Sequence, residues 1–125
     1  MMYDTAETRE LQGRAPLITH HLGDLVIGSE RNGDVHTIAL HGELDLAAAD
    51  EVDRELRRVE GTDARSIVLD LTGLSFMDST GIRVILSADV RSRADANRLR
   101  LVHGPAAVRR GFELSGVVDL LPFTD

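Results

Sequence analysis

From residue 25 to the end of the chain, hydrophobic residues occur in continuous runs, in alternation with polar residues and at helical spacing. An apolar run from Leu25 to Ile27 and an alternating stretch from Val35 to His41 flank Asn32-Gly33, a dipeptide typical of a β-hairpin turn. Residues Ser66 to Leu71 contain the nearly continuous apolar run Ile67-Val68-Leu69, which indicates a strand covered on both faces. The pattern therefore predicts an N-terminal hairpin and a later central strand.

Three segments repeat their apolar residues at the three-and-four spacing of an amphipathic helix. The first extends from Leu46 to Val59 and is ended by Gly61, and the second begins after Asp78. The third begins at Pro105, since proline is favoured in the first turn of a helix, and Gly116 can end it. The apolar positions that carry this spacing are Ala49, Val52, Leu56 and Val59, then Ile82, Ile85, Leu86 and Val90, then Val108 and Phe112.

Two short strands complete the predicted fold, one from Arg98 to Val102 and one at Leu120-Leu121. Because helices separate the strands that follow the hairpin, those strands should be mainly parallel. The predicted fold class is therefore α/β, a single domain whose mixed β-sheet packs with amphipathic helices. Residues 1–20 show no apolar periodicity, so we expect a flexible N-terminal extension there and the domain at 21–125.

Composition limits where the protein can act. With 125 residues, 42% of them hydrophobic, the chain is long enough for one compact domain. The absence of cysteine excludes disulfides and thiol chemistry and suits a reducing compartment. The N-terminus lacks a signal-peptide pattern, and no segment approaches the roughly 18 apolar residues that cross a bilayer. We therefore expect a cytoplasmic protein without a membrane partner.

Charge and residue usage exclude further classes. The net charge is −7 and the chain has three Phe, one Tyr and no Trp, which argues against nucleic acid as a direct partner. All 14 basic residues are arginine, so a P-loop lysine, a Schiff base and a Ser-Lys pair are excluded.

Other catalytic patterns are incomplete. Asp70-Leu71-Thr72 lacks the second acid of an aspartate-phosphatase motif, and we interpret it as a strand terminus in a turn. Ser79 lacks both the G-x-S-x-G elbow and an evident histidine base. His36 and His41 should face opposite sides of one strand, and we interpret the five histidines as surface or loop residues. We expect no catalytic residue, no metal and no cofactor.

The candidate functional residues lie at two junctions between a strand and a helix. A helix beginning at Asp78-Ser79 would direct free backbone N–H groups and the positive end of its dipole toward Ser79, where a phosphate would be favoured. Asp78 or Ser79 is also a typical N-cap, as is Asp45 before the first helix, and the motif alone does not separate capping from regulation. Loops at the carboxyl ends of parallel strands share one edge, so the Asp45 and Ser79 loops should be neighbours.

Three motifs together resemble a known family. They are G-E-L-D-L at 42–46, I-V-L-D-L-T at 67–72 and F-M-D-S-T-G-I at 76–82, supported by a late stretch at 108–117. In order and spacing they are similar to a bacterial anti-sigma factor antagonist, a STAS domain. The resemblance implies that Ser79 is phosphorylated by a partner anti-sigma factor, itself an ATP-using serine kinase.

The resemblance also implies a binding surface and a function. Asp78, Thr80 and Gly81 flank the serine, and Asp45 belongs to the same partner-binding surface. Arg83 departs from the glycine often found there, so its bulk and charge could alter which kinase fits. The expected function is partner switching in transcription regulation, with a phosphatase that resets Ser79. The alternative is an unphosphorylated STAS scaffold in a signalling assembly or an ABC-type lipid transporter.

Overall fold

The computed structural model describes residues 18–22 and 24–124, with side chains from Asp24 onward. Most of the predicted N-terminal extension, residues 1–17, lies outside the described residues. The elements are β1 (Ile18–Leu22), β2 (Leu25–Asn32), β3 (Val35–Leu44), α2 (Leu46–Glu60), β4 (Ser66–Met77), α3 (Ser79–Arg93), β5 (Leu99–Val102), α4 (Ala106–Leu114), the 3-10 helix η1 (Val118–Leu120) and β6 (Phe123–Thr124).

The strands form one mixed sheet in the order β1-β2-β3-β4-β5-β6. The pairs from β1 to β3 are antiparallel, and the pairs from β3 to β6 are parallel. Between β2 and β3, a two-residue turn places Gly33 at a φ of 64°, which glycine adopts without steric cost. The predicted α/β fold class, with a hairpin followed by parallel strands, is confirmed.

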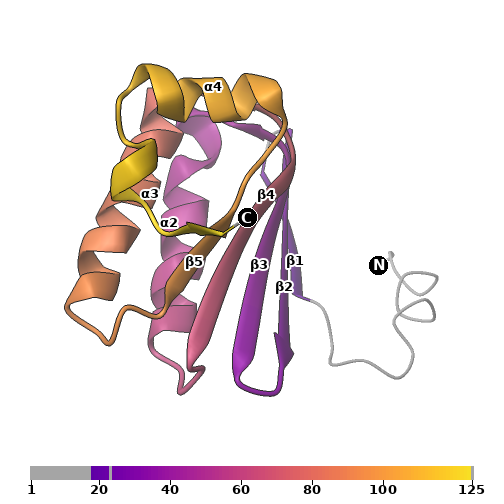
Figure 1. The fold of residues 1–125 in the computed structure, drawn as a ribbon. Coiled ribbons are helices and arrows are strands. Elements are labelled where there is room, and N and C mark those ends of the chain that lie inside the picture. The colour runs from indigo at the N-terminus through magenta and orange to yellow at the C-terminus, as the bar shows by residue number, and fades with distance from the viewer. Residues whose placement is uncertain (1–17, 23, 125) are drawn as a thin grey trace.

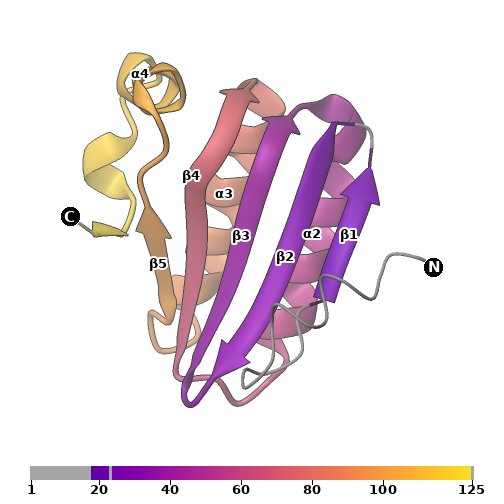
Figure 2. The same cartoon turned by 90° about the vertical axis from the view of Figure 1, so that its right-hand side faces the viewer.

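Helices α2 and α3 cover one face of this sheet, which Figure 1 shows edge-on and Figure 2 shows with both helices behind the strands. The stripe predicted for α2 is confirmed, since Ala49, Val52, Leu56 and Val59 are all buried. Fully burying a large aliphatic side chain contributes about 1.5–3 kcal/mol to folding, so this buried stripe stabilises the packing of α2 on the sheet. The facing strand residues in the core include Leu25, Ile27, Ile38, Leu40, Ile67, Leu69, Leu71, Leu99 and Leu101.

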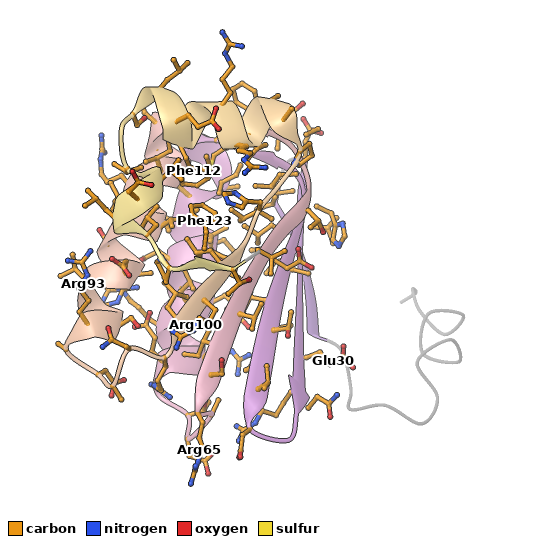
Figure 3. The ribbon with its side chains drawn as sticks, in the orientation of Figure 1. Glu30, Arg65, Arg93, Arg100, Phe112 and Phe123 are labelled. Carbon is orange, nitrogen blue, oxygen red and sulfur yellow. The ribbon has the colours of Figure 1, made fainter. Side chains whose placement is uncertain are left out.

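Helix α4 crosses the carboxyl end of the parallel strands, at the top of Figure 1. Its Phe112 is fully buried and meets the ring of Phe123 edge-on, with the ring centroids 5.1 Å apart. The two rings lie close together in Figure 3. The aromatic pair therefore links α4 to the short edge strand β6.

Two strand boundaries differ from the prediction. The sheet begins with β1, which pairs with β2, whereas the first predicted strand began at Leu25. The last strand is Phe123–Thr124, and the predicted Leu120-Leu121 instead forms the end of η1 and its C-cap. Leu121 is nevertheless buried, because an apolar side chain joins the core in either conformation.

Strand β4 is longer than predicted, because it continues past Leu71 to Met77. Its pairing with β3 shifts register twice near its carboxyl end, which marks β-bulges. The Thr72 N–H donates to Oδ1 of Asp70 at 2.9 Å inside the strand, so the prediction of a strand terminus at these residues is wrong. At Gly73 a Cβ would lie 2.1 Å from Nδ1 of His41, so glycine makes room for that ring.

The predicted apolar face of α3 is wrong at its last position. Val90 is 63% exposed, whereas Asp89 is buried. Nη2 of Arg93 donates to Oδ2 of Asp89 at 2.6 Å, which compensates the buried carboxylate. Ile82 and Ile85 lie on the buried face as predicted.

Candidate functional site

The two predicted junctions lie side by side at the carboxyl ends of β3 and β4. Leu44 and Met77 are partners in the parallel ladder, and the N–H of Asp78 donates to the carbonyl of Leu44 at 3.2 Å. The loops that carry Asp45 and Ser79 therefore leave adjacent strands at the same height. This confirms the predicted neighbourhood of the two loops.

Both aspartates cap the helix that follows them. Oδ1 of Asp78 accepts from the backbone N–H of Thr80 at 2.9 Å and of Gly81 at 3.3 Å. Oδ1 of Asp45 accepts from the N–H of Ala47 at 3.1 Å. Each aspartate has an extended backbone conformation, as an N-cap requires. The caps fix both helix starts through backbone contacts.

Ser79 is exposed in the first turn of α3, and its hydroxyl makes no hydrogen bond to any described residue. Its neighbour Thr80 is half-buried. Fewer backbone N–H groups are free at the start of α3 than the sequence predicted, because the Asp78 carboxylate already accepts from those of Thr80 and Gly81. A phosphate on Ser79 would meet the helix dipole together with an adjacent negative charge.

Gly81 lets α3 approach the ends of both strands. A Cβ at this position would lie 2.7 Å from Cγ of Met77 and 2.9 Å from Cγ of Leu44. Gly42, near the carboxyl end of β3, has a φ of 109° and faces the backbone oxygen of Asp24, which a Cβ would meet at 1.9 Å. Glycine is therefore needed in both motifs for close packing of the site.

Exposed side chains around Ser79 are partly charged and partly apolar. Arg83, one turn further along α3, is exposed and forms no ion pair or side-chain hydrogen bond with the residues that the structure describes. Leu46 and Phe76 are 75% and 47% exposed and flank the two loops. Neither side chain could be assigned to the surface from the sequence, because the helical spacing places Leu46 on the apolar stripe of α2 and Phe76 lies after the predicted strand.

The histidines occupy several environments. His36 is buried, which corrects the interpretation of it as a surface residue, and its Nε2 lies 2.5 Å from Oγ of Ser29. His41 is exposed on the opposite face, as the odd spacing predicted. His103 stacks on Phe123 with the ring centroids 3.9 Å apart.

Within residues 24–124, no group of three His, Cys, Asp or Glu side chains could hold a metal ion. No described helix is long and apolar enough to cross a membrane.

Comparisons with known proteins agree with this architecture. The family model of the STAS domain matches residues 27–125. The anti-sigma-B factor antagonist of Listeria monocytogenes is 32% identical over 92 residues, which cover 74% of this chain and 81% of that protein.

Two solved structures of SpoIIAA are also similar. The anti-sigma factor antagonist SpoIIAA in its unphosphorylated form has a TM-score of 0.66 and 27% identity, covering 79% of this chain and 88% of that one. The Bacillus cell fate determinant SpoIIAA in the phosphorylated form has a TM-score of 0.61 and 26% identity, covering 79% and 91%. The chain therefore belongs to the STAS domain family and is similar to its bacterial anti-sigma factor antagonists.

Proposed function

We propose that this protein is a phosphorylation-switched anti-sigma factor antagonist that works by binding and not by catalysis. In its dephosphorylated form it binds an anti-sigma factor, which then releases a sigma factor in the cytoplasm and permits transcription. The observation that carries the proposal is the exposed, unbonded hydroxyl of Ser79 beside the capped Asp45 loop. Anti-sigma factor antagonists among its relatives, one of them solved in a phosphorylated form, support this assignment.

The binding surface consists of the two loops and their surroundings. Asp45, Asp78, Ser79, Thr80 and Gly81 form its centre, where α2 and α3 begin. Arg83 extends the surface along α3. The exposed apolar side chains beside the loops would provide area that a protein partner can bury. The surface combines acidic and apolar groups and suits a protein partner rather than nucleic acid.

The partner anti-sigma factor is proposed to be the ATP-using kinase that modifies Ser79. The bond between Oγ of Ser79 and the γ-phosphorus of ATP forms as the bond to the β,γ-bridging oxygen breaks. ADP leaves, and the hydroxyl proton passes to a base of the kinase. A serine phosphatase hydrolyses the phosphoester and restores the binding form.

The phosphate acts on binding more than on folding. It adds about −1.5 to −2 charges at pH 7 next to Asp78. Enclosing that charge in the interface without a complementary group on the anti-sigma factor can cost about 3 kcal/mol, which weakens binding a little over a hundredfold. The helix dipole favours the phosphate by only about 0.3–1 kcal/mol, so the phosphorylated domain should remain folded.

The test is to incubate the chain with ATP and candidate anti-sigma factor kinases and to locate added phosphate by mass spectrometry. We expect one phosphate on Ser79 and none in the Ser79→Ala variant. Ser87→Ala is the matched control, because Ser87 is an exposed serine on the same helix. If every kinase that binds the chain left Ser79 unmodified, the proposed switch would be wrong.

Binding measurements distinguish the switch from a scaffold. The Ser79→Ala variant should retain the anti-sigma factor in the presence of ATP, whereas the parent chain should release it. A STAS scaffold would bind its partner equally with or without ATP in both forms. That result would favour the alternative of an assembly or transporter module.

A further inference from the structure

Arginines on the helices of this chain are regularly paired with an acidic residue one turn away. Arg57 donates to Asp53 at 2.9 Å and Arg93 donates to Asp89 at 2.6 Å, each with the acid four residues earlier. Such an arrangement, with the anion on the N-terminal side, is the favourable orientation for a helical ion pair. The other pairs within one helix are Arg54 with Glu51, Arg58 with Glu55 and Arg109 with Glu113.

Arg83 on α3 lacks such an acidic partner. It is exposed, and no described side chain forms an ion pair with it. The residue four positions earlier, where Arg57 and Arg93 have an aspartate, is Ser79. Arg110 on α4 is also without an ion pair among residues 24–124, but the residue four positions before it is Ala106, which cannot acquire a charge. Among the helical arginines that the structure describes, Arg83 alone both lacks an ion pair and has a hydroxyl residue four positions earlier, since Arg91, which follows Ser87 by four positions, pairs with Glu60.

We propose that Arg83 is the intramolecular partner of a phosphate on Ser79, so that phosphorylation completes the helical ion pair that the unmodified chain lacks. The inference rests on the proposed phosphorylation of Ser79 and adds a role for a residue of this chain. Both residues lie in α3, exposed and four positions apart, so their side chains are neighbours on the helix surface.

The chemistry of the two groups and the geometry of the cap favour this pair. A guanidinium binds phosphate through two parallel N–H donors, which fixes the orientation of the phosphate. The N–H groups of Thr80 and Gly81 are already occupied by the carboxylate of Asp78. The phosphate consequently finds few free backbone donors and one adjacent negative charge. Arg83 is the cation that the helix places within reach.

The experiment introduces phosphoserine at position 79 during synthesis and follows the ³¹P chemical shift against pH at low ionic strength. Because a nearby cation favours the dianion, the Arg83→Gln variant should titrate about 0.3 units higher than the parent. Arg83→Lys should retain most of the effect. Arg65→Gln is the matched control, because this exposed arginine directly precedes β4, whereas Ser79 and Arg83 follow the carboxyl end of that strand. Figure 3 shows Arg65 at the bottom of the molecule.

Equal ³¹P titration midpoints in the parent and Arg83→Gln proteins would overturn the ion pair, as would an equal rise in Arg65→Gln. Added salt should reduce the difference, since the pair is exposed. The measurement needs no kinase, so it succeeds or fails independently of the phosphorylation assay. A shifted midpoint with no kinase acting on Ser79 would leave the pair intact and refute the proposed function alone.

Discussion

At the amino ends of β4 and β5, arginine side chains tie the loops together, whereas at the carboxyl ends of β3 and β4 the loops are held by backbone caps. Arg98 donates to the carbonyls of Thr62 at 3.0 Å and Ala64 at 2.6 Å, and also to that of Glu60. Arg91 joins α3 to α2 through two bonds to the Glu60 carboxylate, at 2.8 and 3.0 Å. The hydrogen bond with Glu60 raises the pKa of Arg91.

The difference separates an end of the sheet that is closed by internal bonds from the end where the proposed function places partner binding. At the amino end, a cavity of about 220 Å³ is lined by Glu60, Arg91, Asp95 and Arg98, whose charged groups already bind one another or the backbone. At the carboxyl end, Asp45 and Asp78 stabilise the backbone while leaving the hydroxyl of Ser79 exposed. Mutations at the two ends should therefore have different consequences.

The largest effect on folding is expected for Arg98→Ala. This side chain is 12% exposed, and its loss leaves the carbonyls of Glu60, Thr62 and Ala64 without their donor. We expect a loss of about 2–3 kcal/mol in the free energy of unfolding, measured by urea denaturation. Partner affinity of the folded fraction should not change.

The control for Arg98 is Arg65→Ala at the same end of the sheet. Its side chain is 84% exposed and its contact with Asp34 is 4.0 Å long, so the change should stay within about 0.5 kcal/mol. Equal losses in the free energy of unfolding of the two variants would show that the charge of the arginines, and not the hydrogen bonds to the carbonyls, stabilises the amino end of the sheet. Weaker partner binding by folded Arg98→Ala would break the proposed separation of the two ends.

The next effect compares two glycines that approach Met77 from different helices. Gly81→Ala would bring a Cβ to 2.7 Å from Cγ of Met77, so either that side chain or α3 must shift, at a cost of about 1–3 kcal/mol. In Gly111→Ala the nearest atoms lie at 3.9 and 4.0 Å, which is ordinary contact, and alanine should stabilise α4 by up to about 1 kcal/mol. Thermal unfolding of both variants should give opposite signs, and a stabilised Gly81→Ala protein would contradict the tight packing.

Periodicity predicted much of the fold because helical and strand spacing follow directly from burial on one face. The α2 stripe is an example, since Ala49, Val52, Leu56 and Val59 pack on the sheet as expected. In α3 the pattern placed Val90 inward, but Asp89 occupies the buried position because Arg93 pairs with it. Apolar spacing cannot detect a buried acid that is compensated by its neighbour.

Long-range contacts were equally invisible in the sequence. Asp70, Thr72 and Gly73 have the composition of a turn, yet β4 continues through them with a β-bulge, and Gly73 makes room for the ring of His41. The candidate site was predictable, since capping residues at two junctions and parallel strand order placed the loops together. That Asp78 uses the N–H groups of Thr80 and Gly81 depends on side-chain geometry and could not be predicted.

A smaller effect distinguishes the two helix caps. Asp78→Ala removes the acceptor for two backbone N–H groups and should cost about 1–2 kcal/mol, whereas Asp45→Ala removes one bond and should cost about 0.5–1 kcal/mol. Chemical denaturation measures both, and Asp78→Asn, which can still cap, should recover most of the loss. Full stability in Asp78→Ala would mean that the cap does not hold the start of α3.

The smallest expected effect is the pH dependence that His36 contributes near the amino end of β3. Burial lowers the pKa of His36, and the positive charges of Arg58 and Arg31 lower it further, although Glu55 opposes them. The folded state therefore binds fewer protons than the unfolded state between the folded pKa and the ordinary histidine pKa of 6.5. The contribution of His36 to the free energy of unfolding should be fully present above pH 6.5. It should be lost as the pH decreases from 6.5 toward the folded pKa.

Urea denaturation at several pH values and NMR titration of the His36 ring test this prediction. The His36 midpoint should lie below 6.5, because the imidazole is buried against Ser29 and faces two arginines. The His36→Gln variant should lose that part of the pH dependence, since no titrating group remains at the position. A His36 midpoint at or above 6.5 would mean that Glu55 outweighs burial and both arginines, and acidification would then stabilise the domain through this residue.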